Sequence, residues 1–145
     1  MKENPYLVKL DYNQIRSISK INNPSLDQIS DIALELHRGG INIVVVSMDE
    51  KGAIVVYDRG VVHAIPPKIK NPNLFGNGDS FIAGFAVGLS ENKAIIDTIK
   101  LAMACASANA MSRVHGHVNY HDIEKNFAII KINRLTKWLT QPFNY

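Results

Sequence analysis

The sequence predicts a protein of the α/β class, a layered sheet with helices on both faces. Segments with helical and strand periodicity alternate along the 145 residues in the order β-α-α-β-β-β-α-α-α-β. The run Ile41–Ser47 is rich in β-branched residues with almost no polar alternation, as in strands that are covered on both faces. A composition of 46% hydrophobic and 20% charged residues excludes disordered, collagen-like and disulfide-stapled classes.

The first half of the chain divides at clear helix and turn signals. Ser25 and Gln28 have the spacing of a capping box at a helix start, and Gly39-Gly40 ends that helix. The turns Asp49–Gly52 and Arg59-Gly60 predict an antiparallel meander at the edge of the sheet. The predicted elements are a strand at Tyr6–Leu10, helices at Asn13–Lys20 and Ser25–Arg38, and strands at Ile41–Ser47, Ala53–Tyr57 and Val61–Ile65.

The second half is mainly helical. A loop from Asn71 to Gly78 leads into it, and Asn92 is predicted to cap the longest helix, whose alanine-rich sequence suits close packing. The predicted elements are helices from about Asp79 to Leu89, from Asn92 to about Ser112 and at Asp122–Phe127, followed by a strand at Ala128–Ile132. We therefore expect residues 1–145 to form a single domain.

Charge and hydropathy exclude several classes of partner. The net charge is only +3 and the basic residues are scattered, which argues against nucleic-acid binding. The apolar run Ile43–Val46 is far shorter than the ~20 residues of a membrane-spanning helix. The single cysteine, Cys105, cannot form an internal disulfide and is compatible with a reducing compartment. A cytoplasmic protein is the expectation.

The segment with the clearest chemical signal is Gly76-Asn77-Gly78-Asp79. Glycines at 76 and 78 allow a tight turn and a close approach of the backbone to a ligand. The amides at the start of the following helix would form an anion site suited to a phosphoryl group. Asp79 would then lie close enough to take a proton from an attacking hydroxyl. The other interpretation is an ordinary strand-to-helix connection, in which Asp79 only stabilises the helix dipole.

The wider context favours the first interpretation. The stretch Asn73–Ser80, followed by Ala83-Gly84-Phe85 and Gly88-Leu89, resembles the C-terminal signature of ribokinase-like (pfkB-type) carbohydrate kinases. The resemblance is strongest to the tagatose-6-phosphate kinase and 1-phosphofructokinase branch, and it extends from about Tyr6 to Leu135. The other similar segments are Tyr6–Asp11, Val45–Ala53, Asn109–Met111 and His115–Val118.

This resemblance implies an ATP-dependent kinase of ketohexose phosphates that uses Mg²⁺. Asp79 corresponds to the family's catalytic base, and Gly76, Asn77 and Gly78 correspond to its anion hole. The nucleotide contacts implied by the resemblance also include Ser47, Gly52 and Asn109, the last near the adenine pocket.

The sequence departs from the family pattern at three places. Asp11 and Gln14 stand where the family has an Asn-x-x-Glu that helps to organise Mg²⁺, and the missing glutamate charge should weaken metal binding. Asp49 replaces a glycine, and a negative side chain there would repel ATP phosphates unless it points to solvent. Asn77 replaces a small residue within the anion hole and adds bulk.

The family's N-terminal half, with its sugar-phosphate contacts and lid, is missing from this chain. We therefore expect residues 1–145 to be a single partial domain of a truncated kinase. The alternative is a non-catalytic nucleotide-binding remnant that needs a partner chain. Strands Tyr6–Leu10 and Ile41–Ser47 would lose sheet neighbours, and an unpaired edge with a valine run favours association. The expected partners are ATP, a sugar phosphate, and either a second copy of the chain or a complementing N-terminal half.

Overall fold

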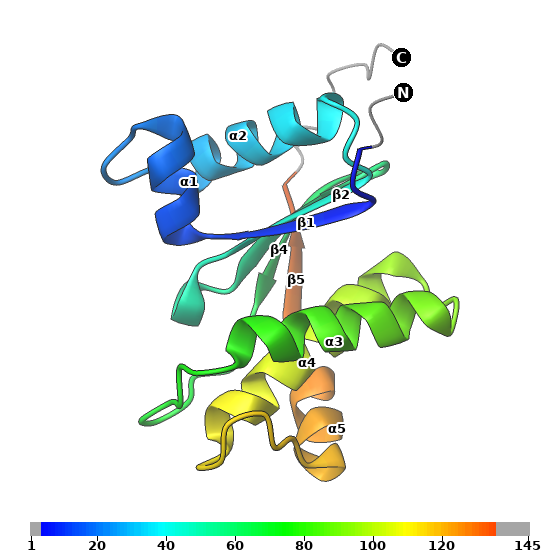
Figure 1. Ribbon diagram of the computed structural model, residues 1–145. Helices are drawn as coiled ribbons and strands as arrows, with labels where there is room; N and C mark the ends of the chain where they lie inside the picture. Colours follow the sequence, from blue (N-terminus) through cyan, green and yellow to red (C-terminus); the bar gives the residue numbers. More distant parts are fainter. Residues whose placement is uncertain (1–3, 136–145) are drawn as a thin grey trace. The chain divides into compact units, whose positions relative to one another are not determined.

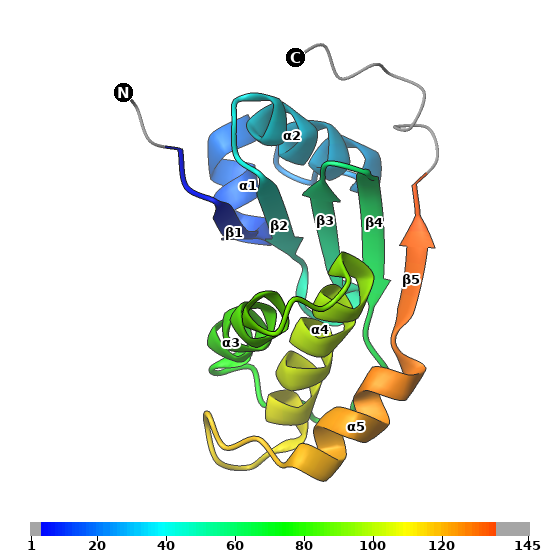
Figure 2. The ribbon, with the colours of Figure 1, turned by 90° about the vertical axis from the view of Figure 1, so that its right-hand side faces the viewer.

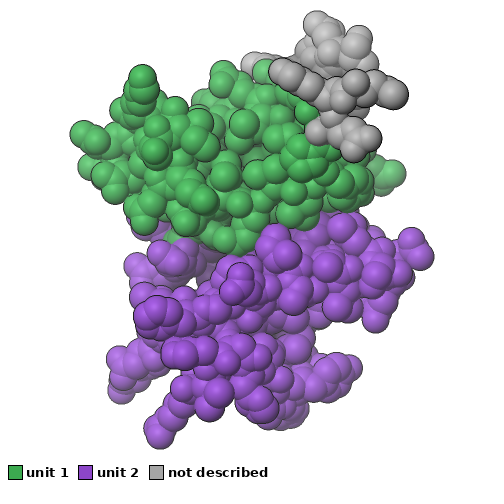
Figure 3. All heavy atoms as spheres, viewed as in Figure 1, with its two compact units in different colours: residues 1–48, 53–63, 133–145 green, residues 49–52, 64–132 purple. Residues whose placement is uncertain are grey.

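The computed structural model describes residues 4–135, so the domain expected over 1–145 extends beyond the described residues at both ends. The chain divides into two compact units, which Figure 3 shows in different colours. Unit 1 consists of residues up to 48, residues 53–63 and residues from 133 onward. Unit 2 consists of residues 49–52 and 64–132.

The predicted α/β class is confirmed, because strands and helices alternate along the chain (Figures 1 and 2). The strands are β1 (Leu7–Asp11), β2 (Ile43–Ser47), β3 (Ala53–Tyr57), β4 (Gly60–Ile65) and β5 (Lys131–Arg134). The helices are α1 (Tyr12–Ser19), α2 (Leu26–Arg38), the short 3₁₀ helix η1 (Asp49–Lys51), α3 (Asn77–Ser90), α4 (Ile95–Met111) and α5 (Tyr120–Ile129).

The strands form one sheet in the order β1-β2-β3-β4-β5. β1 pairs in parallel with β2, with Val8 opposite Val44, and β2 pairs in antiparallel fashion with β3. The expectation that the valine run would lie at an unpaired edge is wrong, since β2 has a neighbour on each side and Val44–Val46 are fully buried. The meander is present but not at the edge, because β5 lies beyond β4. β1 forms one edge of the described sheet.

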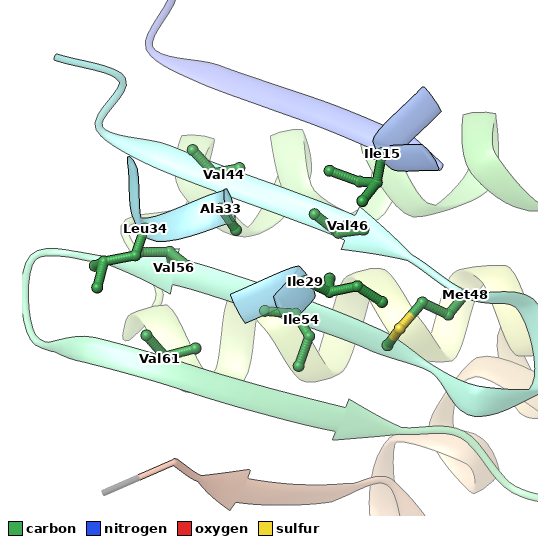
Figure 4. Close-up of a cluster of buried hydrophobic side chains, with 10 residues drawn as sticks. All are labelled: Ile15, Ile29, Ala33, Leu34, Val44, Val46, Met48, Ile54, Val56 and Val61. Atoms are coloured by element: carbon green, nitrogen blue, oxygen red, sulfur yellow. The ribbon is translucent and has the colours of Figure 1, made fainter. Parts of the chain in front are cut away.

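Helices α1 and α2 cover one face of the sheet in unit 1, and Figure 4 shows the buried cluster between them. Ile15, Ile29 and Leu34 project from the helices toward valine and isoleucine side chains of the strands. The predicted capping box at the start of α2 is confirmed: Gln28 N donates to Ser25 Oγ at 3.3 Å, and Ser25 N donates to Gln28 Oε1 at 2.9 Å. This helix start therefore satisfies its own backbone donors.

In unit 2, α3 and α4 pack closely as an antiparallel pair. A Cβ atom at Gly84 would lie 2.9 Å from both Ala102 Cα and Cys105 Sγ, and one at Gly88 would lie 2.7 Å from Thr98 Cγ2. Glycine is therefore required at both positions by the approach of α4. Burial raises the pKa of the Cys105 thiol, which keeps it neutral as a packing group.

The predicted helix start at Asn92 is wrong. Asn92 has a left-handed φ of 53°, and its N–H donates to Leu89 O at 3.0 Å, while Lys93 N–H donates to Gly88 O at 3.0 Å. These bonds form a Schellman motif that ends α3, and asparagine tolerates its left-handed position. Helix α4 begins at Ile95 instead. Asparagine is favoured in both settings, so its residue type did not distinguish a helix end from a helix start.

The boundary between the last helix and the last strand also differs from the prediction. α5 extends to Ile129, and β5 begins at Lys131 rather than Ala128. Asn126 and Ile130 are buried, and Ile123 and Phe127 are half-buried, which is the spacing of a helix face. The Lys100 ammonium lies 4.7 Å from the centre of the Phe127 ring, which adds a contact between α4 and α5. The apolar run after Phe127 continues this helix.

Candidate functional site

The loop before α3 brings the chain into an unusual helix start. Gly76 occupies the N-cap position with φ 78°, a left-handed conformation that glycine adopts at little cost. Its carbonyl accepts the first helical hydrogen bond, from Ser80 N at 2.9 Å. Among residues 4–135, no side chain caps this helix start. The backbone N–H groups of Asn77, Gly78 and Asp79 precede the first intrahelical bond and are available to an anion.

Asp79 lies in the first turn of α3 and its side chain is exposed. Its carboxylate is therefore next to the free amides in sequence and open to a ligand. An anion held by those amides would have a carboxylate as its neighbour, which is the combination that proton abstraction during phosphoryl transfer requires.

Asn109, near the end of α4, connects the loop to the rest of unit 2. It is fully buried, and its Nδ2 donates to Phe75 O and to Asn77 Oδ1, both at 2.7 Å. Its Oδ1 accepts from Gly116 N at 2.9 Å. Both polar atoms of the Asn109 side chain are thus occupied by other parts of the protein. The sequence places this residue among the nucleotide contacts, whereas in the structure it contacts the loop itself.

The Asn77 side chain does not obstruct the helix start. Its Oδ1 accepts from Asn109, and its Nδ2 donates to Asn73 O at 3.0 Å. Asn73 in turn accepts from Phe75 N through its Oδ1 at 3.0 Å, and its backbone N–H donates to Ala110 O at 2.8 Å. We call Asn73, Asn77 and Asn109 the asparagine clamp. The larger side chain of Asn77 is therefore held by hydrogen bonds within this clamp.

The segment around η1 has a defined backbone geometry. Asp49 has φ 49°, the left-handed region that favours glycine, and its side chain is exposed. Its carbonyl accepts from Gly52 N at 3.0 Å. Gly52 has φ 88°, and a Cβ there would collide with Ala64 O and lie 2.9 Å from Pro66 Cδ. Glycine at 52 is therefore required by close backbone packing in unit 2.

The proposed metal ligands Asp11 and Gln14 form a helix cap. Gln14 N donates to Asp11 Oδ1, and Asp11 N donates to Gln14 Oε1, each at 2.8 Å. An oxygen atom of each side chain is thus engaged at the start of α1. Within residues 4–135 there is no group of three or more His, Cys, Asp or Glu side chains that could hold a metal ion. The role of these two residues in holding magnesium therefore stays a prediction.

A cleft that the sequence did not indicate lies elsewhere in unit 2. It has a volume of about 380 Å³, within the ~300–1,000 Å³ typical of small-molecule sites. Its lining combines apolar side chains with two lysines and an amide: Pro67, Lys68, Ile69, Lys70, Met111, Asn126 and Ile129. Residues Pro67–Lys70 directly precede the loop that carries Gly76, so the cleft and the helix start share one segment of chain. None of the nucleotide contacts expected from the sequence lines it.

Within unit 2, the structure brings several of the expected site residues together. Gly76 and Asn77 are joined to Asn109 by hydrogen bonds, and Gly78 and Asp79 follow them in the first turn of α3. Ser47 belongs to unit 1, where its Oγ donates to Leu10 O at 3.4 Å. The asparagine bonds were missed because they join residues that are 32 and 34 positions apart in the sequence.

Two curated proteins are similar in sequence to most of this chain. The 1-phosphofructokinase of Borreliella burgdorferi is 26% identical over 134 residues, which cover 91% of this chain and 43% of that protein. The tagatose-6-phosphate kinase of Staphylococcus epidermidis is 26% identical over 133 residues, which cover 90% of this chain and 42% of that protein. The chain thus spans about two fifths of the length of these curated relatives.

The fold is also that of a known group of structures. The crystal structure of ribokinase from Thermotoga maritima has a TM-score of 0.72 and 22% identity, and the match covers 85% of this chain and 42% of that one. This likeness confirms the ribokinase-like fold expected from the sequence. Among the described residues, no helix is both long and apolar enough to span a membrane. The family model for pfkB carbohydrate kinases matches residues 1–116, and the chain therefore belongs to the pfkB family of carbohydrate kinases.

Proposed function

We propose that this chain supplies the phosphoryl-transfer part of an ATP-dependent kinase of ketohexose phosphates, with tagatose 6-phosphate or fructose 1-phosphate as the acceptor. The observation that carries the proposal is the uncapped start of α3, where three free amides lie beside the exposed Asp79. The names of the relatives, 1-phosphofructokinase and tagatose-6-phosphate kinase, support the choice of acceptor.

In the proposed reaction, the amides of Asn77, Gly78 and Asp79 stabilise the negative charge on the phosphoryl group during transfer. Fixed donors of this kind contribute most where charge develops in the transition state. Asp79 accepts the proton of the attacking sugar hydroxyl, a role that typically contributes ~10²–10⁴ in rate.

We further propose that the nucleoside of ATP lies in the cleft beside Ile69 and Met111. The apolar side chains suit a planar base, and Lys68 and Lys70 give the lining a positive charge that suits an anionic ligand. The magnesium ion implied by the family would be held mainly through the nucleotide's phosphates, since Mg²⁺ commonly takes one or two carboxylates and substrate oxygens. None of the roles given to the residues here depends on that ion.

The second candidate function is a nucleotide-binding remnant that needs a partner chain. The residues aligned with the relatives are about two fifths of their length, so the sugar-phosphate part of such a kinase would come from other residues. The remnant is also favoured by β1, an edge strand of the described sheet whose Leu7, Val8 and Leu10 are only half-buried. The partner would be a complementing N-terminal half or a second copy of this chain.

Two measurements separate the candidates. Titration calorimetry with ADP tests nucleotide binding, and a coupled assay measures ADP release from ATP with and without tagatose 6-phosphate or fructose 1-phosphate. Sugar-dependent ADP release supports the kinase. Binding without turnover supports the remnant, and absence of ADP binding contradicts both. Light scattering at increasing protein concentration tests the association expected of the remnant, which a strictly monomeric profile would exclude for copies of this chain.

A further inference from the structure

We propose that the asparagine clamp consists of positioning residues: Asn73, Asn77 and Asn109 hold the free amides of α3 in the arrangement that binds a phosphate. This inference rests on the proposed function and adds to it the residues that organise the anion site. Only Asn77 belongs to the four-residue loop motif, and the other two lie before it and on another helix.

The first argument concerns Gly76, which the clamp fixes from both sides. Asn109 Nδ2 binds the carbonyl of Phe75, the residue before Gly76, and the side chain of Asn77, the residue after it. A Cβ on Gly76 would lie 3.5 Å from Asn109 Nδ2, so the left-handed residue is also packed against the Asn109 amide. Because φ at Gly76 directs the following amides, fixing this residue fixes the helix start.

The second argument concerns competition for the amides. Asparagine side chains in turns readily accept hydrogen bonds from nearby backbone N–H groups, and such a bond would exclude an anion. The Oδ1 of Asn77 is already occupied by Asn109, and its Nδ2 by the carbonyl of Asn73. The clamp therefore keeps the Asn77 side chain from capping its own helix. An alanine at 77 would also leave the amides free, but it would remove both of these bonds.

The third argument is that the asparagine clamp leaves one buried polar group without a hydrogen bond, which is energetically unfavourable. Asn73 Nδ2 is buried and has no hydrogen-bond partner within the described part of the chain. Unpaired buried amide groups are unfavourable and uncommon in folded proteins. A loop selected for stability alone would avoid this group. The Oδ1 and main-chain atoms of Asn73 are nevertheless all used to hold Phe75, Asn77 and the end of α4.

The clamp also reaches the loop that follows α4. Gly116 N donates to Asn109 Oδ1 at 2.9 Å, and the rings of Phe75 and His115 contact each other edge to face with their centres 5.1 Å apart. The Phe75 side chain is 73% exposed, so this ring contact lies at the surface, whereas Asn109 lies beneath it. Two loops are thus connected through one buried side chain.

The expected size of the effect follows from the population of the competent loop. Apparent affinity falls in proportion to the fraction of molecules that have the binding-competent arrangement. If the loop without Asn109 adopts that arrangement about a tenth of the time, ADP affinity falls about tenfold. Adenosine carries no phosphate and does not need the amides, so its affinity should not change.

The test uses the whole chain with Asn109→Ala, Asn77→Ala and the double variant. Calorimetry measures the affinities for ADP and adenosine, and amide NMR follows the signals of residues 76–79. The control is Thr98→Ala: Thr98 is also buried on α4 and its Oγ1 bonds Lys93 O at 3.5 Å, but it lies roughly 16 Å along the helix from Asn109. We expect Asn109→Ala to weaken ADP binding about tenfold and shift the amide signals. The double variant should lose no more than Asn109→Ala alone, because the residues act as a unit.

The outcomes are distinct. Wild-type ADP affinity and unchanged amide signals in the clamp variants overturn the inference. Equal losses for ADP and adenosine, or an equal loss of ADP affinity in Thr98→Ala, also overturn it, because a general loss of structure would then be the cause. If the wild-type chain binds no ADP while Asn109→Ala alone shifts the signals of residues 76–79, the clamp is upheld as the support of the loop and the proposed function fails.

Discussion

Helices α2 and α3 differ in what happens to the backbone N–H groups of their first turns, which have no partner within the helix. At α2, Ser25 and Gln28 satisfy each other's backbone donors in a capping box. At α3, a left-handed glycine occupies the cap position, and no side chain in the described part of the chain forms a hydrogen bond to the first amides. The asparagine at the start of α3 has its side chain bound elsewhere. A capped start stabilises the fold, whereas a start kept uncapped by neighbouring side chains is suited to a ligand.

The largest expected effect is a loss of turnover when the carboxylate in the first turn of α3 is replaced by an amide. In the sugar-phosphate assay, Asp79→Asn should lower turnover by ~10²–10⁴, because it removes the proposed base, while ADP affinity stays near that of the wild type. Asp27 lies in the first turn of α2, so Asp27→Asn is the matched control. Its loss of dipole stabilisation, about 0.3–1 kcal/mol, should not affect turnover. Full turnover in Asp79→Asn would show that the carboxylate is not the base.

A smaller effect is expected from the backbone at Gly76. Alanine at this left-handed position should lower the free energy of unfolding by about 1–2 kcal/mol and weaken ADP binding, because the amides would be redirected. Gly40, which follows α2, also has a positive φ, 106°, and the three atoms nearest to a Cβ there would all belong to the side chain of Asn4. Gly40→Ala should therefore cost similar stability without changing ADP affinity. Urea unfolding and calorimetry measure the two quantities. Equal ADP affinities in the two variants would contradict the special role of Gly76.

The smallest effect is expected when the serine that caps the start of α2 is replaced. Ser25→Ala should lower the free energy of unfolding by about 1 kcal/mol, the usual cost of removing a serine cap, with no change in ADP binding. Chemical denaturation measures the first quantity and an ADP titration the second. If Ser25→Ala weakened ADP binding as strongly as Gly76→Ala, the two helix starts would not differ in the way described.

The sequence predicted elements well where local signals were sufficient. The Ser25–Gln28 box and the buried valine strand β2 depend on neighbouring residues and on composition, and both were confirmed. Asn92 was misassigned because asparagine suits a helix start and a left-handed helix end alike. The strand predicted at Ala128 is a helix through Ile129, because Asn126 and Ile130 are buried at helical spacing and Phe127 contacts Lys100 of α4, a contact that the local run does not reveal.

The candidate site was only partly predictable for a related reason. Gly76 and Asp79 belong to one short motif, so a role in binding and transferring a phosphoryl group could be proposed from the residues alone. The role of Asn109 depends on hydrogen bonds to a loop more than thirty positions earlier, and no local pattern encodes them. The cap that joins Asp11 and Gln14 was also not expected: one oxygen of each side chain accepts a backbone hydrogen bond at the start of α1.

The glycine contacts between α3 and α4 have a consequence for motion in unit 2. Gly84 fits against Ala102 and Gly88 against Thr98 with no space for a methyl group, so α3 has little freedom to slide along α4. Further along the same antiparallel pair, Asn109 is bonded to Asn77. A shear displacement at the start of α3 would have to carry the end of α4 with it. The loops before α3 and after α4 should therefore shift as a single rigid piece, and not as independent flaps.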